Sequence, residues 1–298
     1  MGEPAAGRGI ALSVGASAVF ALMSGYAKLL APLTGLDIFA WRILWTAPFT
    51  LLLLALRRRV PELRRLAARA AANPRIALAL PVAAGLLGAQ LWVFLWAPLH
   101  GRMLEVSLGY FLLPLTMVLV ARFYYGERLD PVQWLAVGCA AVGVAHELWA
   151  THAFSWPTLL VALGYPPYFV LRRRISADPL ALFAVEMLLL VPVAAFMVAT
   201  SQSALAAFDR AALWSALLPG LGVLSTLGLS CYLMASRLLP MALFGILGYV
   251  EPVLILVVAV TLLGERLSAP QLATYVPIWI AVALTGVHSV AILRANAR

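Results

Sequence analysis

The sequence predicts an all-α integral membrane protein with ten transmembrane helices, arranged as two inverted five-helix repeats. Three observations lead to this fold class. Of the 298 residues, 64% are hydrophobic and 11% are charged, whereas about a quarter of the residues in a soluble domain are charged. Apolar segments of roughly 20 residues, the length that crosses a bilayer as a helix, recur along the chain. The second half also repeats motifs of the first half.

The apolar segments are separated by short polar stretches, and their ends are uncertain by several residues. They cover residues 9–30, 36–56, 76–98, 104–125, 131–149, 157–171, 180–200, 212–236, 240–263 and 270–293. The first segment follows Arg8 and has features of a signal peptide. Its length and the many comparable segments after it indicate an uncleaved helix instead. The sixth is the least regular, because it is short and contains Pro166 and Pro167.

Basic residues predict the orientation, because loops rich in arginine and lysine stay on the cytoplasmic side. With the N-terminus inside, most of the 21 arginines and lysines lie on the inner side. The five in the outer half are Lys28, Arg42, Arg102, Arg210 and Arg266. Both termini are therefore expected to be cytoplasmic.

Two stretches of the chain resemble each other. "SLGYFLLPLTMVLVARFYYGERL" begins at Ser107, and "ILGYVEPVLILVVAVTLLGERL" begins at Ile246. Their prolines, Pro114 and Pro252, are 138 residues apart. Upstream the offset is 144, and it relates Lys28 to Arg172, Phe39 to Phe183, Arg42 to Glu186 and Pro48 to Pro192. These offsets indicate an internal duplication.

A five-helix repeat has an odd number of spans, so the second copy must enter the membrane from the side opposite to the first. We assign the first repeat to residues 1–150 and the second to residues 151–298. The loops agree, because "RRRVPELRRLAARAAANPR" in the first repeat is strongly basic while its counterpart "SQSALAAFDRA" is nearly neutral. Inverted repeats are typical of transporters, in which mirrored halves open a central site to each side in turn.

The motifs "SLGYFLLPL", "YYGERL" and "GYVEPVLILVVAVTLLGERL" resemble those of the RarD-like permeases, in the EamA branch of the drug/metabolite transporter superfamily. The resemblance covers nearly the whole chain and is most specific at Ser107–Leu135 and at Ile278 and Trp279. It implies a protein of the bacterial inner membrane with ten helices as inverted five-helix repeats and with both termini on the cytoplasmic side. It also implies export or exchange of small metabolites without an ATP-binding domain.

Glu251 lies in an apolar segment, eleven residues after Pro240 and thirteen before Gly264, which places it near the bilayer midplane. An ionisable residue there costs about 2.5–3.5 kcal/mol and normally faces a cavity or a partner. Pro252 disfavours helical geometry at Glu251 itself, so carbonyls nearby could face a cavity. Two interpretations stay open. Glu251 binds a substrate ammonium or a coupling proton, or it makes a structural hydrogen bond.

Other polar and aromatic residues complete a candidate substrate site. Arg42 and Glu186 occupy corresponding places in the two repeats and either bind charged groups of the substrate, help close gates, or form structural ion pairs and snorkel to the interface. The remaining candidates form an amphipathic pocket or serve as membrane-interface anchors. They are Gln90, Trp96, Tyr110, Tyr168, Tyr249 and Trp279.

Several residues are left out of the site. Glu127 and Glu265, in the two Gly-Glu-Arg turns, are expected to be structural caps or loop contacts. His146 and Glu147 are either a proton relay or, as we favour, ordinary packing residues. The histidines and the two cysteines have no metal-ligand spacing, and the chain lacks the glycine-rich phosphate loop of ATPases. We therefore expect no metal and no cofactor.

The predicted function is secondary transport of small metabolites or drug-like amphipathic compounds by alternating access. The expected partners are a small-molecule substrate, the lipid bilayer and, as a candidate coupling ion, a proton. The arginines do not form a basic face interleaved with aromatics, so nucleic acid is not expected. Two alternatives are a non-transporting membrane scaffold and an intramembrane lipid-modifying enzyme with Glu251 or Glu186 as its general base.

Overall fold

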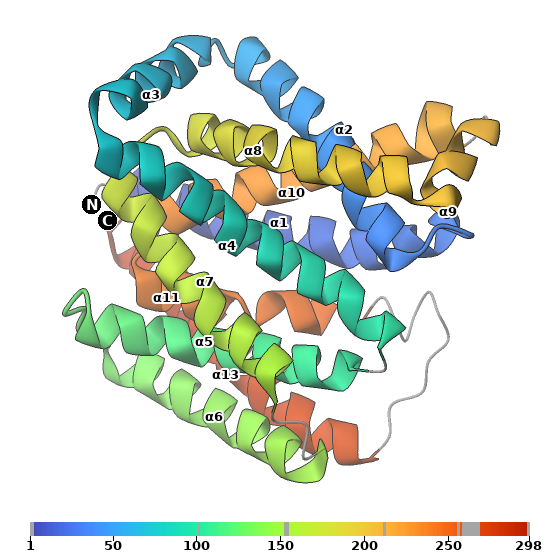
Figure 1. Cartoon of the computed structure of the whole chain (residues 1–298). Coiled ribbons are helices and arrows are strands. Elements are labelled where there is room, and N and C mark those ends of the chain that lie inside the picture. The colour runs from blue at the N-terminus through green and yellow to red at the C-terminus, as the bar shows by residue number, and fades with distance from the viewer. Residues whose placement is uncertain are drawn as a thin grey trace. The chain divides into compact units, whose positions relative to one another are not determined.

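The computed structural model describes residues 3–100, 102–151, 155–210, 213–254, 257 and 269–296, and within these ranges it contains helices and no strand (Figure 1). The helices are α1 (Glu3–Tyr26), η1 (Ala27–Leu30), α2 (Gly35–Leu56), α3 (Val60–Ala72), α4 (Pro74–Leu99), α5 (Met103–Phe123), α6 (Pro131–Thr151), α7 (Trp156–Ile175), α8 (Pro179–Thr200), α9 (Gln202–Leu205), η2 (Ala206–Asp209), η3 (Leu213–Leu217), α10 (Leu218–Leu238), α11 (Met241–Leu247) and α13 (Ala269–Asn296).

Six helices in the described part of the chain are long and apolar enough to cross a membrane. They span Ala6–Met23, Gly35–Leu56, Pro74–Phe94, Glu105–Phe123, Pro179–Thr200 and Leu213–Leu238. Shorter apolar helices cover Met241–Leu254 and Leu272–Thr285. The all-α fold with multiple spans is confirmed, while ten spans in inverted repeats stay a prediction.

The sixth predicted segment is longer than expected, because α7 continues through Pro166 and Pro167 to Ile175. Proline has no amide hydrogen, so Pro166 leaves the carbonyl of Ala162 without its usual helical donor. The hydroxyl of Thr116 in α5 donates to that carbonyl oxygen at 2.7 Å. A neighbouring helix thus compensates for the proline, and α7 is not interrupted.

The basic stretch after α2, which we predicted as a loop, contains the helix α3. Its sequence favours this, with Pro61 in the first turn and alanine, leucine and arginine beyond it. Leu66 on its apolar side is buried against Leu80, Ile175 and Leu182. The high charge led us to expect a loop and concealed the amphipathic helix.

The chain forms two compact units, and each combines segments from both halves of the sequence. Unit 1 contains Met1–Ala21, Met103–Pro166 and Met234–Arg298, and unit 2 contains Leu22–Arg102 and Pro167–Leu233. The units are therefore not the two repeats. The assignment of the two sequence repeats to residues 1–150 and 151–298 stays a prediction, because the compact units do not test it.

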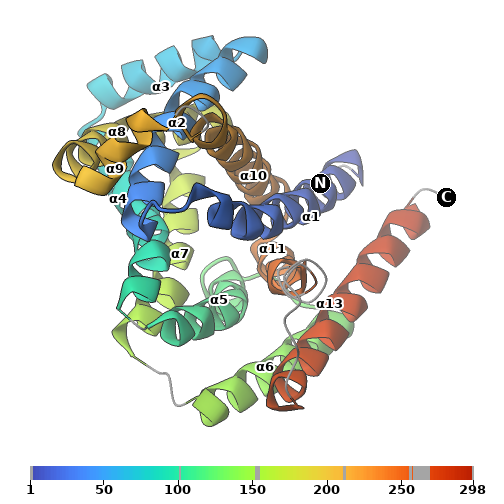
Figure 2. The ribbon, with the colours of Figure 1, turned by 90° about the vertical axis from the view of Figure 1, so that its right-hand side faces the viewer.

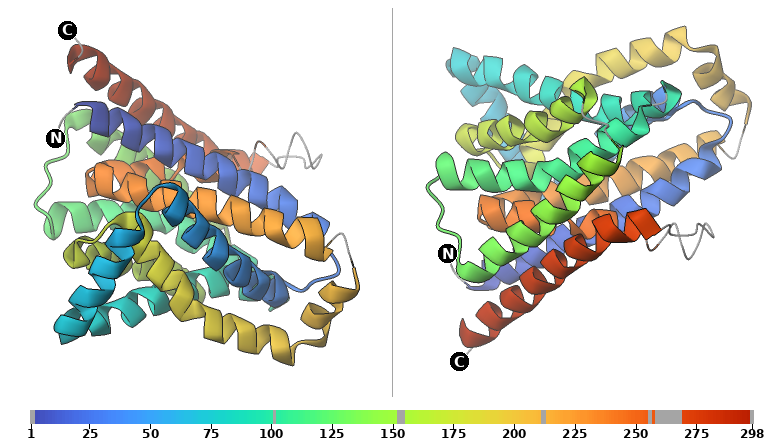
Figure 3. Two further views of the ribbon diagram at one scale, coloured as in Figure 1. Left: turned by 90° about the horizontal axis from the view of Figure 1, so that it is seen from above. Right: turned by 90° about the horizontal axis from the view of Figure 1, so that it is seen from below.

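In unit 1, α5 packs against α11 and α6 packs against α13. The second pair lies side by side in two views of the ribbon (Figure 2 and Figure 3). The carboxylate of Glu127 accepts hydrogen bonds from the amides of Met241 and Ala242, at 2.8 and 3.0 Å, at the start of α11. Glu127 is therefore a structural cap, as expected. Glu265 lies outside the described residues.

In unit 2, α2 packs against α8, and α4 packs against both. Thr34 and Asp37 form a capping box at the start of α2. The hydroxyls of Ser201 and Ser203 also donate to the Asp37 carboxylate, both at 2.6 Å. These bonds fix the start of α2 to the connection between α8 and α9.

The close packing of α6 on α13 can be tested at Gly143. A Cβ added there would lie 2.6 Å from the carbonyl oxygen of Thr274, whereas a Cβ at Gly138 on the same helix would meet nothing within 4 Å. Gly143→Ala is expected to destabilise the fold by about 1–3 kcal/mol through overpacking. Gly138→Ala should be neutral or stabilise it by up to about 1 kcal/mol. Thermal unfolding in detergent measures both, and equal melting temperatures would contradict this packing.

Candidate functional site

The structure divides the predicted site residues between the two units. Unit 2 contains Arg42, Gln90, Trp96, Tyr168 and Glu186, and unit 1 contains Tyr110, Tyr249, Glu251 and Trp279. Direct contact between members of this set is seen for Tyr168 and Glu186. We describe the residues of each unit separately.

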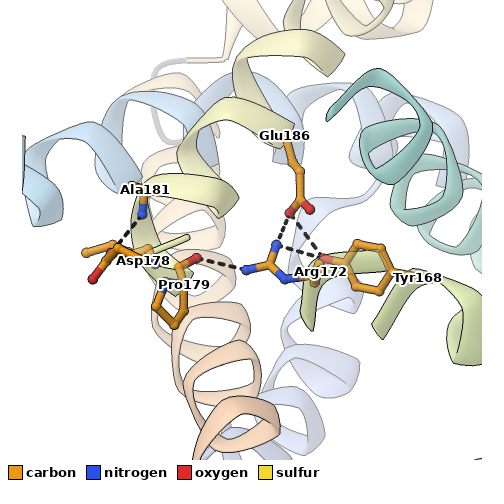
Figure 4. A network of polar contacts seen from close by, with 7 residues as sticks. Tyr168, Arg172, Asp178, Pro179, Ala181 and Glu186 are labelled. Carbon is orange, nitrogen blue, oxygen red and sulfur yellow. Dashed lines mark hydrogen bonds and ion pairs between the residues drawn. The ribbon is translucent and has the colours of Figure 1, made fainter. Parts of the chain in front are cut away.

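Glu186 of α8 is fully buried and forms an ion pair with Arg172 of α7 (Figure 4). The hydroxyl of Tyr168 donates to the same carboxylate oxygen at 3.1 Å. The other terminal nitrogen of Arg172 donates to the carbonyl oxygen of Pro179 at 2.8 Å. A buried carboxylate without a counter-charge is strongly unfavourable, so Arg172 and Tyr168 allow Glu186 to lie inside the helix bundle.

The local sequence explains how this network forms. Tyr168 and Arg172 are four residues apart on α7 and therefore lie on one face of the helix. The Arg172 guanidinium carbon lies 5.5 Å from the centre of the Tyr168 ring. Asp178 caps the start of α8 by accepting hydrogen bonds from the amides of Leu180 and Ala181, both at 3.0 Å. The cap and the Arg172–Pro179 bond together fix the turn between the two helices.

Sequence reasoning missed Arg172 because it counted the residue with the basic loop "RRRIS". The signal that could have identified it is the spacing of four residues to Tyr168, together with an acid on the next apolar helix. Arg172 is 2% exposed, unlike its neighbour Arg174, which is exposed.

Arg42 of α2 contacts a different helix. Its Nε donates to the hydroxyl of Ser225 in α10 at 2.8 Å, and the side chain is half-buried. Arg42 and Glu186 hold equivalent places in the repeats, but the partner of the acid in this structure is Arg172.

The other two candidates in unit 2 lie on α4. Gln90 is 1% exposed. Trp96 stacks on His100, with ring centres 4.2 Å apart, and His100 Nδ1 lies 2.9 Å from the Trp96 carbonyl oxygen. Trp96 is near the end of α4, a position typical of an interfacial aromatic residue.

In unit 1, Tyr249 is buried, and its hydroxyl donates to the carbonyl oxygen of Phe111 in α5 at 2.9 Å. It sits where α11 ends at Leu247, and the chain is helical again from Val250 to Leu254. We expected irregular backbone at Glu251, but the break lies at Gly248 and Tyr249. Pro252 is compatible with this arrangement, because proline is tolerated in the first turn of a helical segment, where amides lack intrahelical acceptors.

The remaining candidates in unit 1 are partly buried. Glu251 is half-buried in the segment that follows the break. The rings of Tyr110 and Tyr165 have centres 6.3 Å apart. Trp279 of α13 packs near Tyr275, and its buried indole nitrogen has no hydrogen-bond partner in the described part of the chain.

The histidine and acid of α6 take part in packing against α13. The hydroxyl of Thr274 donates to a Glu147 carboxylate oxygen at 2.7 Å, and His146 Nδ1 lies 3.0 Å from the same hydroxyl. Within the described residues, no group of three histidine, cysteine, aspartate or glutamate side chains could hold a metal ion.

The ion pair makes a prediction about stability. Arg172→Gln should destabilise the protein by about 3–5 kcal/mol, because it leaves the Glu186 charge buried without its partner. The double variant Arg172→Met with Glu186→Leu should recover most of this loss, since it removes both charges. Arg174→Gln is the matched control and should leave the melting temperature unchanged, because its side chain is exposed. A double variant less stable than Arg172→Gln would contradict this account.

Comparison with known proteins gives the family. The model described as the EamA-like transporter family matches residues 157–287. The chain is 50% identical to the chloramphenicol-sensitive protein RarD of Pseudomonas aeruginosa over 292 residues, which is 98% of each protein. It is 36% identical to an uncharacterized transporter of Haemophilus influenzae, covering 95% of this chain and 94% of the other. The identity to the protein RarD of Escherichia coli is 30%, covering 93% of each.

A solved crystal structure with 18% sequence identity superimposes with a TM-score of 0.67, covering 94% of this chain and 98% of that chain. At this identity the likeness shows a shared fold alone. The apolar helices and the transporter relatives together identify a multi-pass membrane protein. The chain belongs to the EamA-like transporter family, as a RarD-like member.

Proposed function

We propose that this protein is a secondary transporter that moves small metabolites or drug-like amphipathic compounds by alternating access. The family supports transport, and the internal duplication supports the mechanism. Of the matched helices, α2 packs on α8, α5 on α11 and α6 on α13, so equivalent elements of the two halves meet in pairs. This pairing is the observation that carries the proposal, because inverted repeats exchange conformations by such rearrangements.

We further propose that the protein lies in a bacterial inner membrane with both termini in the cytoplasm. The basic stretch that contains α3 supports this orientation, because its seven arginines are all exposed. They are Arg57, Arg58, Arg59, Arg64, Arg65, Arg69 and Arg75.

Glu251 is our candidate for the coupling group. It is half-buried directly after the break at Gly248 and Tyr249, and an acid within an apolar segment is usually functional. The transporter names of the relatives argue against the alternative of a lipid-modifying enzyme. The name of the Pseudomonas aeruginosa relative suggests one compound for a substrate panel, which is chloramphenicol.

The proposal predicts flux through the purified protein in proteoliposomes. Uptake of at least one compound from a panel of metabolites and antibiotics, chloramphenicol included, should exceed that of protein-free liposomes. If a proton is coupled at Glu251, Glu251→Gln should fold normally and lose the pH dependence of uptake. Glu62→Gln, on the surface helix α3, is the control and should transport like the wild type.

Absence of flux for every compound, with and without a proton gradient, would contradict the transport proposal. An unchanged pH profile in Glu251→Gln would assign Glu251 a structural role while leaving transport itself supported.

A further inference from the structure

One face of α2 carries a row of hydrogen-bond donors. Arg42, Thr46 and Thr50 follow one another at intervals of four residues, so their side chains project from the same side of the helix, and Trp45, three residues after Arg42, lies at the edge of that side. The row flanks Pro48, which lies inside α2 and deprives the carbonyl of Leu44 of its helical donor.

At Arg42, Trp45 and Thr46, α2 contacts α10 within unit 2, and the two helices are close to each other in the ribbon (Figure 2). A Cβ on Gly222 would lie 2.6 Å from the Trp45 Cβ, so the backbones approach closely at this point. Ser225 accepts from Arg42 at 2.8 Å, and Thr226 donates to the carbonyl oxygen of Thr46 at 3.3 Å.

Several polar atoms of α2 and α10 are buried and have no hydrogen-bond partner in the described part of the chain. The side chains of Thr46 and Thr50 are fully buried, and neither hydroxyl has a hydrogen-bond partner among the residues that the structure describes. The same holds for the indole nitrogen of Trp45 and for the hydroxyl of Ser230 in α10. A buried polar atom without a partner destabilises a protein, so a group of them calls for a reason.

Elsewhere the chain satisfies threonines in helices in the ordinary way. The hydroxyl of Thr285 in α13 donates to the carbonyl oxygen of Ala281 at 2.8 Å, and that of Thr200 in α8 donates to Phe196 at 2.9 Å. Such bonds to a carbonyl four residues earlier are the usual solution for a threonine inside an apolar helix. Thr46 and Thr50 do not make them, which leaves both hydroxyls able to donate to a ligand.

The chemistry of the row selects the ligand. The Arg42 guanidinium and the Trp45 indole donate hydrogen bonds and accept none, and both threonine hydroxyls can donate. Glu186, on the neighbouring helix α8, forms its ion pair with Arg172. Donors around one positive charge, away from water, favour an oxyanion.

We infer that this face of α2 binds the anionic, oxygen-rich end of the transported molecule, a carboxylate or a phosphate. Arg42 supplies the charge, and Trp45, Thr46 and Thr50 supply the hydrogen bonds. This inference rests on the proposed transport function and names the substrate class that the site selects. Close packing of α10 here belongs to the conformation described, and the transport cycle must open the face to admit the anion.

The first test separates stability from transport. Thr46→Val and Thr50→Val keep the side-chain shape and remove the unused hydroxyls, so the double variant should melt at the same temperature as the wild type or higher. Its affinity for the anion that stabilises the wild type in the second test should be about tenfold weaker or more, because two hydrogen bonds are lost. Thr285→Val, which removes a satisfied hydroxyl, is the matched control and should transport normally. A double variant that binds the anion as tightly as the wild type does would overturn the inference.

The second test identifies the ligand class by thermal shift and by uptake into proteoliposomes. The probes are sets of one carbon chain with different ends: gluconate as the carboxylate, sorbitol 6-phosphate as the phosphate, sorbitol as the neutral match and N-methylglucamine as the cation. A wider panel of organic acids and sugar phosphates is tested with matched alcohols and amines. At least one anion should raise the melting temperature of the wild type and be taken up, whereas its neutral and cationic matches should have little effect. Arg42→Gln should abolish both the thermal shift and the uptake of that anion. The carboxylate and phosphate arms show which oxyanion is preferred.

Uptake of neutral or cationic compounds alone would overturn the oxyanion site while leaving the transport function intact. A wild-type protein that takes up nothing from these sets or from the metabolite and antibiotic panel would overturn both.

Discussion

The structure depends on one constraint, which is that polar groups inside apolar helices must be partnered within the protein. Glu186 shows it most clearly. Its carboxylate is fully buried on α8, and it is held there by the Arg172 guanidinium and the Tyr168 hydroxyl from one face of α7. Removing one partner of such a pair is far more costly than removing both. The two helices are therefore joined through a shared charge as well as through apolar packing.

The same constraint explains how the helices accommodate prolines and ends. Thr116 bonds the carbonyl that Pro166 leaves without a donor in α7, and Glu127 accepts the first amides of α11. Tyr249 bonds a carbonyl of α5 from the break after α11. In each case a side chain from a neighbouring element supplies what the backbone lacks. The unused donors of Trp45, Thr46 and Thr50 are among the exceptions in the described part of the chain, which also include the hydroxyl of Ser230 and the indole nitrogen of Trp279.

The sequence predicted the helices well because length and hydropathy are local properties. The helix α3 was not predicted, since a high charge conceals a narrow apolar side such as that of Leu66. Arg172 was counted as a loop charge because it is the first of three consecutive arginines that follow the predicted segment 157–171. Its role depends on the fold of α7 against α8, which no single segment contains. The break was expected at Glu251 but lies at Gly248 and Tyr249, because proline is also compatible with the first turn of a helical segment.

The composition of the two units could not be predicted from the duplication. Duplicated sequence suggests two halves, whereas packing brings α2 to α8 and α6 to α13 across the halves. Among the candidate site residues, Tyr168 and Glu186 contact each other in a buried network with a structural role. Arg42 lies close to other hydrogen-bond donors of α2 and bonds to Ser225 of α10, which the sequence alone does not show. Glu251 keeps its position next to a helix break, and its role stays a prediction.

The central claim is alternating access to the α2 face, and cysteine labelling at Thr50 tests it most directly. In a background with Cys139→Ala and Cys231→Ala, Thr50→Cys is treated with a membrane-impermeant maleimide in right-side-out and in inside-out vesicles. Alternating access predicts labelling from both sides, reduced from both when a transported anion is bound. Labelling from one side only, or from neither, would contradict the claim.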